Sequence, residues 1–254
     1  MTVAELPVRV RDLVAGAHRV VALTGAGIST DSGIPDFRGP DGVWTRNPAA
    51  ARMFTLQAYR DDPQVRRQAW RNRRDHPAWH ARPNAAHAAL ARLAAAGRLR
   101  AVITQNIDGL HQRAGVPDEQ VIEIHGTLFE VECLGCAQRT AMAEALERVA
   151  AGEPDPPCRS CGGILKAATI SFGQQLDRTT LRRAVEAAAG CDLMLAVGTS
   201  LTVQPAAALV EVAAAEAGAP GVIVNASPTP YDHIADAVVR EPIGAVLPTL
   251  LAEG

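Results

Sequence analysis

Four of the five cysteines stand in two CxxC pairs, and this pattern is the most specific chemical signal in the chain. The pairs are Cys133 with Cys136 and Cys158 with Cys161. Zinc favours four soft ligands in a tetrahedron, and two such pairs supply them. Because four thiolates leave no open coordination position, we expect one structural Zn²⁺ and not a catalytic metal. Redox-active pairs or two disulfides are the alternatives, and Cys191 has no assigned role.

Three segments of small residues, each after an apolar run, are typical of nucleotide-binding sites. The apolar run 20–24 passes into Gly25-Ala26-Gly27, where the absence of side chains lets backbone N–H groups approach a diphosphate. Thr30 stands where the dinucleotide fingerprint has a third glycine, so a plain turn is the alternative. After two later apolar runs, Gly198-Thr199-Ser200 and Asn225-Ala226-Ser227 offer hydroxyl and amide groups to a nucleotide. A simple turn and a cap are the alternative for these two segments.

Polar side chains follow two further apolar runs. The run 99–104 leads into three such side chains, Gln105, Asn106 and Asp108, with the apolar Ile107 among them. Ligands of α/β enzymes bind at the carboxyl ends of strands, so the Asn106 amide and the Asp108 carboxylate could hold a nucleotide. Alternatively, these two side chains could merely cap the next helix. His125 follows the run 121–124, and an imidazole with an unperturbed pKa of ~6.5 can act as a base there. A structural role is the alternative for His125.

The elements that must position these residues are indicated by alternating apolar and alanine-rich segments. Strands are expected at 19–24, 99–104, 120–124, 192–197 and 221–224, and helices at 84–96 and 205–217. This alternation predicts an α/β fold, with a Rossmann-like parallel sheet and helices on both faces.

Two segments interrupt the alternation. Residues 41–82 are rich in Arg, Trp and Pro, and residues 129–167 contain the CxxC pairs. We expect these two segments to form a small inserted domain, partly helical and partly zinc-binding. Residues 1–40, 83–128 and 168–254 would then form the Rossmann-like domain that binds the dinucleotide.

The overall composition excludes some classes of function. With 25 basic and 27 acidic residues the net charge is −2, which gives no reason to expect a nucleic-acid partner. The chain has no apolar run of the ~18 residues that a membrane span requires and no basic-then-apolar leader. We therefore expect a cytoplasmic protein that does not bind membranes.

The motifs resemble those of the sirtuin family. GAGIST, DSGIPDFRG, TQNIDGLH, IEIHGT, VGTSLTV and VNAS match that family's pattern in the same order over nearly the whole chain. The resemblance implies an NAD-dependent protein lysine deacetylase or deacylase, whose products are nicotinamide, O-acyl-ADP-ribose and free lysine. It also implies that acyl-lysine proteins or peptides are the partners. We expect the enzyme to act as a monomer.

The resemblance further implies roles for individual residues. His125 would be the catalytic base, with Asn106 and Asp108 orienting the ribose and the nicotinamide. The residues expected to contact NAD are Gly25, Ala26, Gly27, Thr30, Asp36, Phe37, Arg38, Gln105, Asn106, Ile107, Asp108, His125, Gly198, Thr199, Ser200, Asn225, Ala226, Ser227 and Ile243. A substrate peptide would lie as an added strand, pairing with Phe172-Gly173 on one side and with residues near Val203 on the other.

Two departures from the family pattern concern the acyl group. The segment 166–174 lacks the family's proline, paired valines and acid around its phenylalanine. Relatives that remove acidic acyl groups carry a Tyr-x-x-Arg pair, whereas this chain has Trp70 and Arg73 at the nearest match. We therefore expect acetyl-lysine as the substrate, with other acyl chains as alternatives. Mono-ADP-ribosyl transfer from the same NAD site, or non-enzymatic sensing of NAD or ADP-ribose, are the alternative functions.

Overall fold

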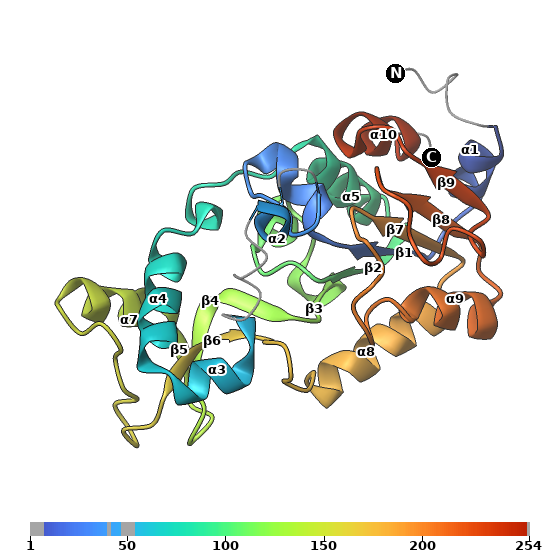
Figure 1. The fold of residues 1–254 in the computed structure, drawn as a ribbon. Helices are drawn as coiled ribbons and strands as arrows, with labels where there is room; N and C mark the ends of the chain where they lie inside the picture. Colours follow the sequence, from blue (N-terminus) through green and yellow to red (C-terminus); the bar gives the residue numbers. More distant parts are fainter. Residues whose placement is uncertain (1–7, 40–41, 47–53, 253–254) are drawn as a thin grey trace.

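The larger sheet has six parallel strands in the order β3-β2-β1-β7-β8-β9 (Figure 1). The computed structural model describes residues 8–39, 42–46 and 54–252. The strands are β1 Val20–Thr24, β2 Leu99–Thr104, β3 Val121–Glu123, β7 Leu193–Val197, β8 Gly221–Val224 and β9 Ala237–Val239. The order reverses between β1 and β7, and ligands of such sheets bind outside the strand ends at this point.

Five strands of this sheet were predicted, and each prediction agrees with the structure to within one residue at each end. These strands are β1, β2, β3, β7 and β8. The sixth strand, β9, was not predicted. It has three residues at the edge of the sheet, two of them only partly buried, so it produces no recognisable apolar run.

Helices cover both faces of the sheet, which confirms the predicted fold class (Figure 1). One face carries α1 Val8–Ala15, α5 Ala85–Ala95 and α10 Ile243–Leu250, and the other carries α8 Arg178–Ala189 and α9 Leu209–Ala217. Side chains of β1 alternate between the two cores, with Val20 and Ala22 on the first face and Val21 and Leu23 on the second. Along the described ranges, no helix combines the length and hydropathy needed to cross a bilayer.

One predicted helix begins later than expected. The prediction 205–217 is wrong at its start, because α9 begins at Leu209. Residues 205–208 form tight turns instead, in which the N–H groups of Ala208 and Leu209 donate to carbonyls three residues earlier. The helix ends as predicted, at Gly218 in the left-handed conformation.

A second, antiparallel sheet carries the cysteines. It contains β4 Gly126–Cys133, β5 Arg139–Ala141 and β6 Leu165–Thr169 in the order β5-β4-β6, with α7 Met142–Ala150 beside it. The helical segment contributes α2 Val43–Arg46, α3 Leu56–Asp61, α4 Pro63–Arg74 and the 3-10 helix η4 Pro77–Trp79. Trp70 of α4 is buried in one core with Val131 and Met142, so the helical and cysteine-containing segments pack together.

The predicted domain division stays a prediction. Its boundaries at 128/129 and 167/168 fall inside β4 and β6, so these strands continue from one expected domain into the other. Residues 1–7, 40, 41, 47–53 and 253–254 of the division lie outside the described residues.

Two buried histidines, His87 and His111, lie beside the carboxyl end of β1. The rings of His87 and His111 are 5.0 Å apart between centroids, and His111 Nε2 lies 3.0 Å from Thr24 Oγ1. His87 belongs to the capping box of α5, with its Nδ1 3.0 Å from Asn84 Oδ1. His87 Nε2 and His111 Nδ1 are buried without a hydrogen-bond partner among the described residues.

This pair is expected to make the fold acid-sensitive. Burial lowers the pKa of His87 to about 4, and burial together with the charge of His87 lowers the pKa of His111 to about 3. Unfolded histidines titrate near ~6.5, so the stability that the neutral rings contribute is present above that pH and is lost as the pH falls toward the folded values. His111→Gln should flatten the decline in melting temperature between pH 6.5 and 4, as measured by circular dichroism. Exposed His233→Gln is the control, and an unchanged slope in His111→Gln would contradict the prediction.

Candidate active site

A cleft of about 900 Å³ runs along the carboxyl ends of the parallel strands and beneath the small sheet. Every residue assigned to NAD, catalysis or substrate by the sequence motifs lies in its wall. The nineteen positions expected to contact NAD come from both halves of the chain. They meet in one cleft because β1 and β7 are neighbours in the sheet, although these strands are far apart in sequence. Their individual roles stay predictions, but the structure brings them to one place.

The glycines after β1 are required for the close packing of two loops, and their contact with NAD stays a prediction. The N–H of Gly25 donates to Val197 O at 3.0 Å, and that of Gly27 donates to Gly198 O at 2.9 Å. A Cβ on Gly25 would lie 2.7 Å from Gly198 O, and one on Gly27 would lie 2.8 Å from Gly198 Cα. The glycines therefore allow the two loops to pack together, and their N–H groups are used in doing so. The 3-10 helix η2, Ala26–Ser32, starts in this cradle and directs its N-terminal end to the cleft.

Asp108 and Asn106 meet at a buried serine. Asp108 Oδ2 accepts a 2.7 Å hydrogen bond from Ser29 Oγ, and its Oδ1 accepts one of 3.0 Å from the N–H of Leu110. The N-cap of α6 Leu110–Arg113 is Gly109 and not Asp108, but Asp108 Oδ1 does accept from the N–H of the first residue of this helix. Burial raises the pKa of Asp108. Ser29 was not predicted, although it stands inside the GAGIST motif.

The Asn106 amide is oriented by the glycine loop. Its Nδ2 donates to Gly25 O at 3.1 Å and to Ser29 Oγ at 3.2 Å. Because an amide nitrogen has two hydrogens, both donors are used inside the protein, and the amide oxygen is left to accept from a ligand. Asn106 is 9% exposed and lines the cleft.

His125 is held with one ring nitrogen as a donor. Its Nδ1 lies 3.1 Å from the carbonyl oxygen of Gln105, and because a carbonyl can only accept, Nδ1 carries the hydrogen. Nε2 therefore has the lone pair that a general base needs. Burial lowers the pKa of His125, so the ring is neutral at pH 7. Gln105 also donates from Nε2 to Thr199 Oγ1 at 2.8 Å, which joins the base to the loop after β7.

An arginine that was not predicted shapes the loop after β8. Arg240 Nη1 donates to the carbonyl oxygens of Asn225 and Ser227, each at 2.7 Å, and the other end of its guanidinium pairs with Asp232. Asn225 Nδ2 donates to Ser227 O at 2.8 Å, so the segment is a closed turn. No motif in the sequence indicated Arg240, because it lies thirteen to fifteen residues from its carbonyl partners.

The predicted peptide pairing needs a correction at Phe172. The N–H of Phe172 donates to Phe54 O at 2.9 Å, and its carbonyl accepts from the N–H of Leu56 at 3.0 Å. Both strand-pairing groups of Phe172 are therefore used by the helical segment. Gly173 and Val203, which both line the cleft, remain as the positions that an added strand could contact.

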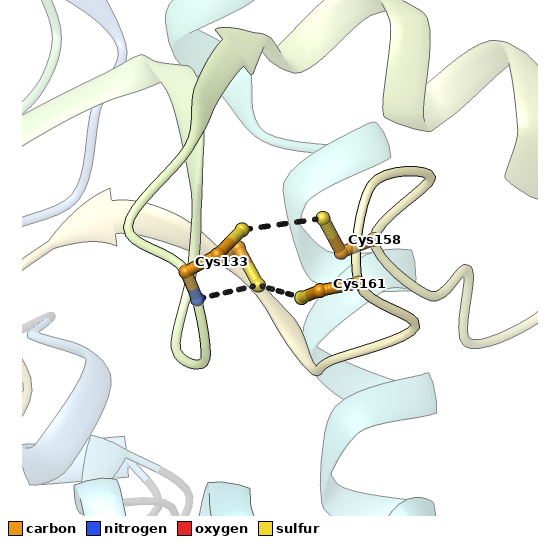
Figure 2. A group of neighbouring side chains, drawn as sticks. Cys133, Cys158 and Cys161 are labelled. Atoms are coloured by element: carbon orange, nitrogen blue, oxygen red, sulfur yellow. Dashed lines mark hydrogen bonds between the residues drawn. The ribbon is translucent and has the colours of Figure 1, made fainter.

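The four paired cysteines form one cluster, with all their Sγ atoms within 4.8 Å of one another. Figure 2 shows Cys133, Cys158 and Cys161 facing one another from two turns. The N–H groups of Cys136 and Gly135 donate to Cys133 Sγ and lower the pKa of that thiol to about 6. All five cysteines lie in the described residues and none forms a disulfide.

This cluster fits a zinc ion by the chemistry of its donors. Four thiols at one point, with backbone N–H groups directed at sulfur, match a closed structural site. The two turns are also alike in backbone, because Ala137 and Gly162 follow the paired cysteines in the left-handed conformation. Cys133 and Cys158 belong to the same core as Trp70, which couples the cluster to the packing of the small sheet.

Comparison with known proteins places the chain in a family. Residues 25–205 match the Sir2 family, which covers the glycine loop, the polar strand ends, His125 and the cysteines. The chain belongs to the Sir2 family. This confirms the resemblance to sirtuins, and the match ends at Pro205, before Asn225 and Arg240.

Relatives within the Sir2 family align with nearly the whole chain. The chain is 54% identical to NAD-dependent protein deacetylase 2 of Streptomyces coelicolor over 93% of its own length and 98% of that protein. It is 44% identical to NAD-dependent protein deacetylase 1 of Bradyrhizobium diazoefficiens, over 94% and 92% of the two chains. A solved Sir2 variant with a deacetylated p53 peptide and 3'-O-acetyl ADP ribose has a TM-score of 0.88 and 34% identity, over 100% of this chain and 99% of that one.

Proposed function

We propose that this protein is an NAD-dependent protein lysine deacetylase. The observation that carries the proposal is the convergence of His125, Asn106, Asp108 and both small-residue loops on one cleft of a Sir2-family chain. The reaction would convert NAD, acetyl-lysine and water into nicotinamide, O-acetyl-ADP-ribose and lysine. The names of the relatives in Streptomyces and Bradyrhizobium support this activity.

The cleft has the features that NAD requires. The loops after β1 and β7 form a cradle so close that a Cβ on Gly27 or Gly198 would collide with backbone atoms. Hydroxyls of Thr199 and Ser200 and the turn at Asn225 lie further along the same wall and would hold ribose and phosphate oxygens. Bound NAD would supply an electrophilic ribose carbon, from which nicotinamide departs as the acyl oxygen of the substrate attaches.

The residues of the chain would then orient groups and move protons. The oxygen of Asn106 would accept a hydrogen bond from the ligand, because both of its donors are held by Gly25 and Ser29. Asp108, fixed by Ser29 and by the N–H of Leu110, would keep the nicotinamide end in place. His125 Nε2 would take the proton of a ribose hydroxyl, and Nδ1 would stay bonded to Gln105 O throughout. The cysteine cluster would hold zinc for structure and take no part in these steps.

Incubation with NAD and an acetyl-lysine peptide tests this function. Nicotinamide and deacetylated peptide should appear in equal amounts, with O-acetyl-ADP-ribose as the third product, measured by chromatography and mass spectrometry. Equal amounts are expected because one NAD is consumed for each acyl group transferred. ADP-ribose found covalently on protein, without deacetylated peptide, would establish ADP-ribosyl transfer in place of deacetylation.

A further inference from the structure

A loop in the wall of the cleft rests on an aromatic ring outside the cleft. Asp108 lies in the loop between β2 and α6, and the next residue, Gly109, has the left-handed conformation with a φ of 65°. A Cβ on Gly109 would lie only 2.8 Å from Cε2 of Phe129, so the ring packs directly against this glycine. Glycine both adopts the positive φ and leaves room for the ring. Phe129 belongs to β4 and, unlike Asp108, does not line the cleft.

The backbone of β4 holds the same loop. The N–H of Leu128 donates to Ile107 O at 3.0 Å, which fixes the residue before Asp108. The side chain of Leu128 is fully buried in a small hydrophobic cluster, which we call the loop core. The loop core consists of Ile34, Ala78, Ala81, Leu110 and Leu128, with Trp79 and Ile107 packed against it. It therefore joins the segment after η2, the helical segment and the loop that carries Asp108.

A tryptophan of the helical segment packs against the Phe129 ring. The centroids of the Trp79 and Phe129 rings are 5.3 Å apart and the rings are nearly perpendicular, which is a favourable edge-to-face arrangement. Trp79 Nε1 donates to Arg73 O at 2.7 Å, and this bond fixes the position of the indole. We call Trp79 and Phe129 the aromatic pair. Through this pair, η4 and α4 support the backbone at Gly109.

Asp108 depends on the position of its backbone. Its carboxylate is held by Ser29 Oγ at 2.7 Å and by the N–H of Leu110 at 3.0 Å. Burial raises the pKa of Asp108, so these bonds are what offset the cost of a charge in this place. A displacement of about 1 Å would break such bonds, and misplacement of this size can cost on the order of a hundredfold in rate. The packing behind the loop therefore bears on the chemistry in front of it.

We propose that Phe129, supported by Trp79, is a positioning residue that holds Asp108 at the nicotinamide end of bound NAD. The inference rests on the proposed deacetylase function, and both rings lie outside the six sequence motifs. Neither ring lines the cleft, so the effect passes through Gly109 to Asp108. A loosened loop weakens the hold on nicotinamide. It leaves the rest of the cleft unchanged, because the loops after β1 and β7 are joined by their own hydrogen bonds.

Two ligands, one with and one without the nicotinamide group, test the inference. Nicotinamide, as a product, inhibits deacetylation by occupying its end of the cleft, whereas ADP-ribose fills the cleft without it. In Phe129→Leu the inhibition constant of nicotinamide should rise about tenfold, because leucine does not fill the space of the ring behind Gly109. The dissociation constant of ADP-ribose, measured by calorimetry, should stay within about twofold of wild type. Phe129→Tyr, which keeps the ring, should restore the wild-type inhibition constant.

A second variant and a matched control separate positioning from general packing. Trp79→Phe keeps an aromatic ring but loses the bond to Arg73 O, so it should raise the nicotinamide constant by a smaller factor than Phe129→Leu does. Leu146→Ala is the control, because Leu146 packs against the same core of the small sheet as Trp79 but has no part in the loop core. It should lower the melting temperature and leave the ratio of the two constants unchanged.

The ratio of the two constants decides the outcome. A nicotinamide constant that is unchanged in the folded variants, Phe129→Leu or, if that chain does not fold, Trp79→Phe, would overturn the inference. An ADP-ribose affinity that falls by the same factor would also overturn it, because the whole cleft would then be damaged. A wild-type protein that produces no deacetylated peptide would overturn the proposed function as well. A wild-type enzyme that deacetylates, with variants that nicotinamide inhibits equally, keeps the function and loses only this inference.

Discussion

Replacing His125 with alanine is expected to reduce deacetylation by a factor on the order of a hundred to ten thousand, which is the range that general acid–base catalysis contributes. We expect the ring nitrogen Nε2 to accept the proton, because Gln105 O fixes the hydrogen on Nδ1. Alanine removes the acceptor and leaves the carbonyl of Gln105 exposed to water. Deacetylated peptide and O-acetyl-ADP-ribose, measured under saturating NAD, would report the loss.

The variant should still bind the dinucleotide. The loops after β1 and β7 are joined by their own hydrogen bonds, so ADP-ribose affinity in calorimetry should change far less than turnover. His233→Ala, at an exposed position, is the control for the loss of an imidazole. Turnover within threefold of wild type in His125→Ala would show that another group accepts the proton.

Removing zinc is expected to have the second large effect. Structural zinc contributes apparent binding energies of about 10–16 kcal/mol in zinc-finger peptides, and much of that is folding energy. Cys133 and Cys158 share a core with Trp70, Val131 and Met142, so the loss of the metal should unfold the small sheet around them. Wild-type protein should contain one zinc per chain by atomic absorption. Chelation, or Cys158→Ser, should expose the Trp70 indole to solvent, seen as a red-shifted fluorescence.

Activity should fall together with the small sheet, although none of the four paired cysteines lines the cleft. The strand β6 leads from Leu165 to Thr169 and then to Phe172 in the cleft wall, so loosening the cysteine end displaces the substrate side. Cys191→Ser is the matched control. That residue is buried in the core of the large sheet, away from the cluster, and its replacement should leave the zinc content at one. A metal-free protein with native fluorescence and full activity would refute the structural role.

The elements of the large sheet could be predicted because local pattern determines them. Apolar runs such as 20–24 are buried on both faces, and this burial is visible in the apolar residue types themselves. The small sheet was not predicted in detail because β4 alternates buried and partly buried positions irregularly and β5 has three exposed or partly exposed residues. Their pairing depends on long-range contacts that no local window contains.

Residue types and their spacing were enough to indicate the candidate chemical groups, which are the four thiols, the histidine after an apolar strand and the small-residue turns. How these groups are bonded and packed became visible only in the folded chain. Gly25 and Gly27 serve loop packing, Phe172 is paired with the helical segment, and Phe129 packs against Gly109. Hydrogen-bond partners depend on which atoms come together in space, and the chain brings together residues as many as 227 positions apart, as in the hydrogen bond between Arg9 and Asp236.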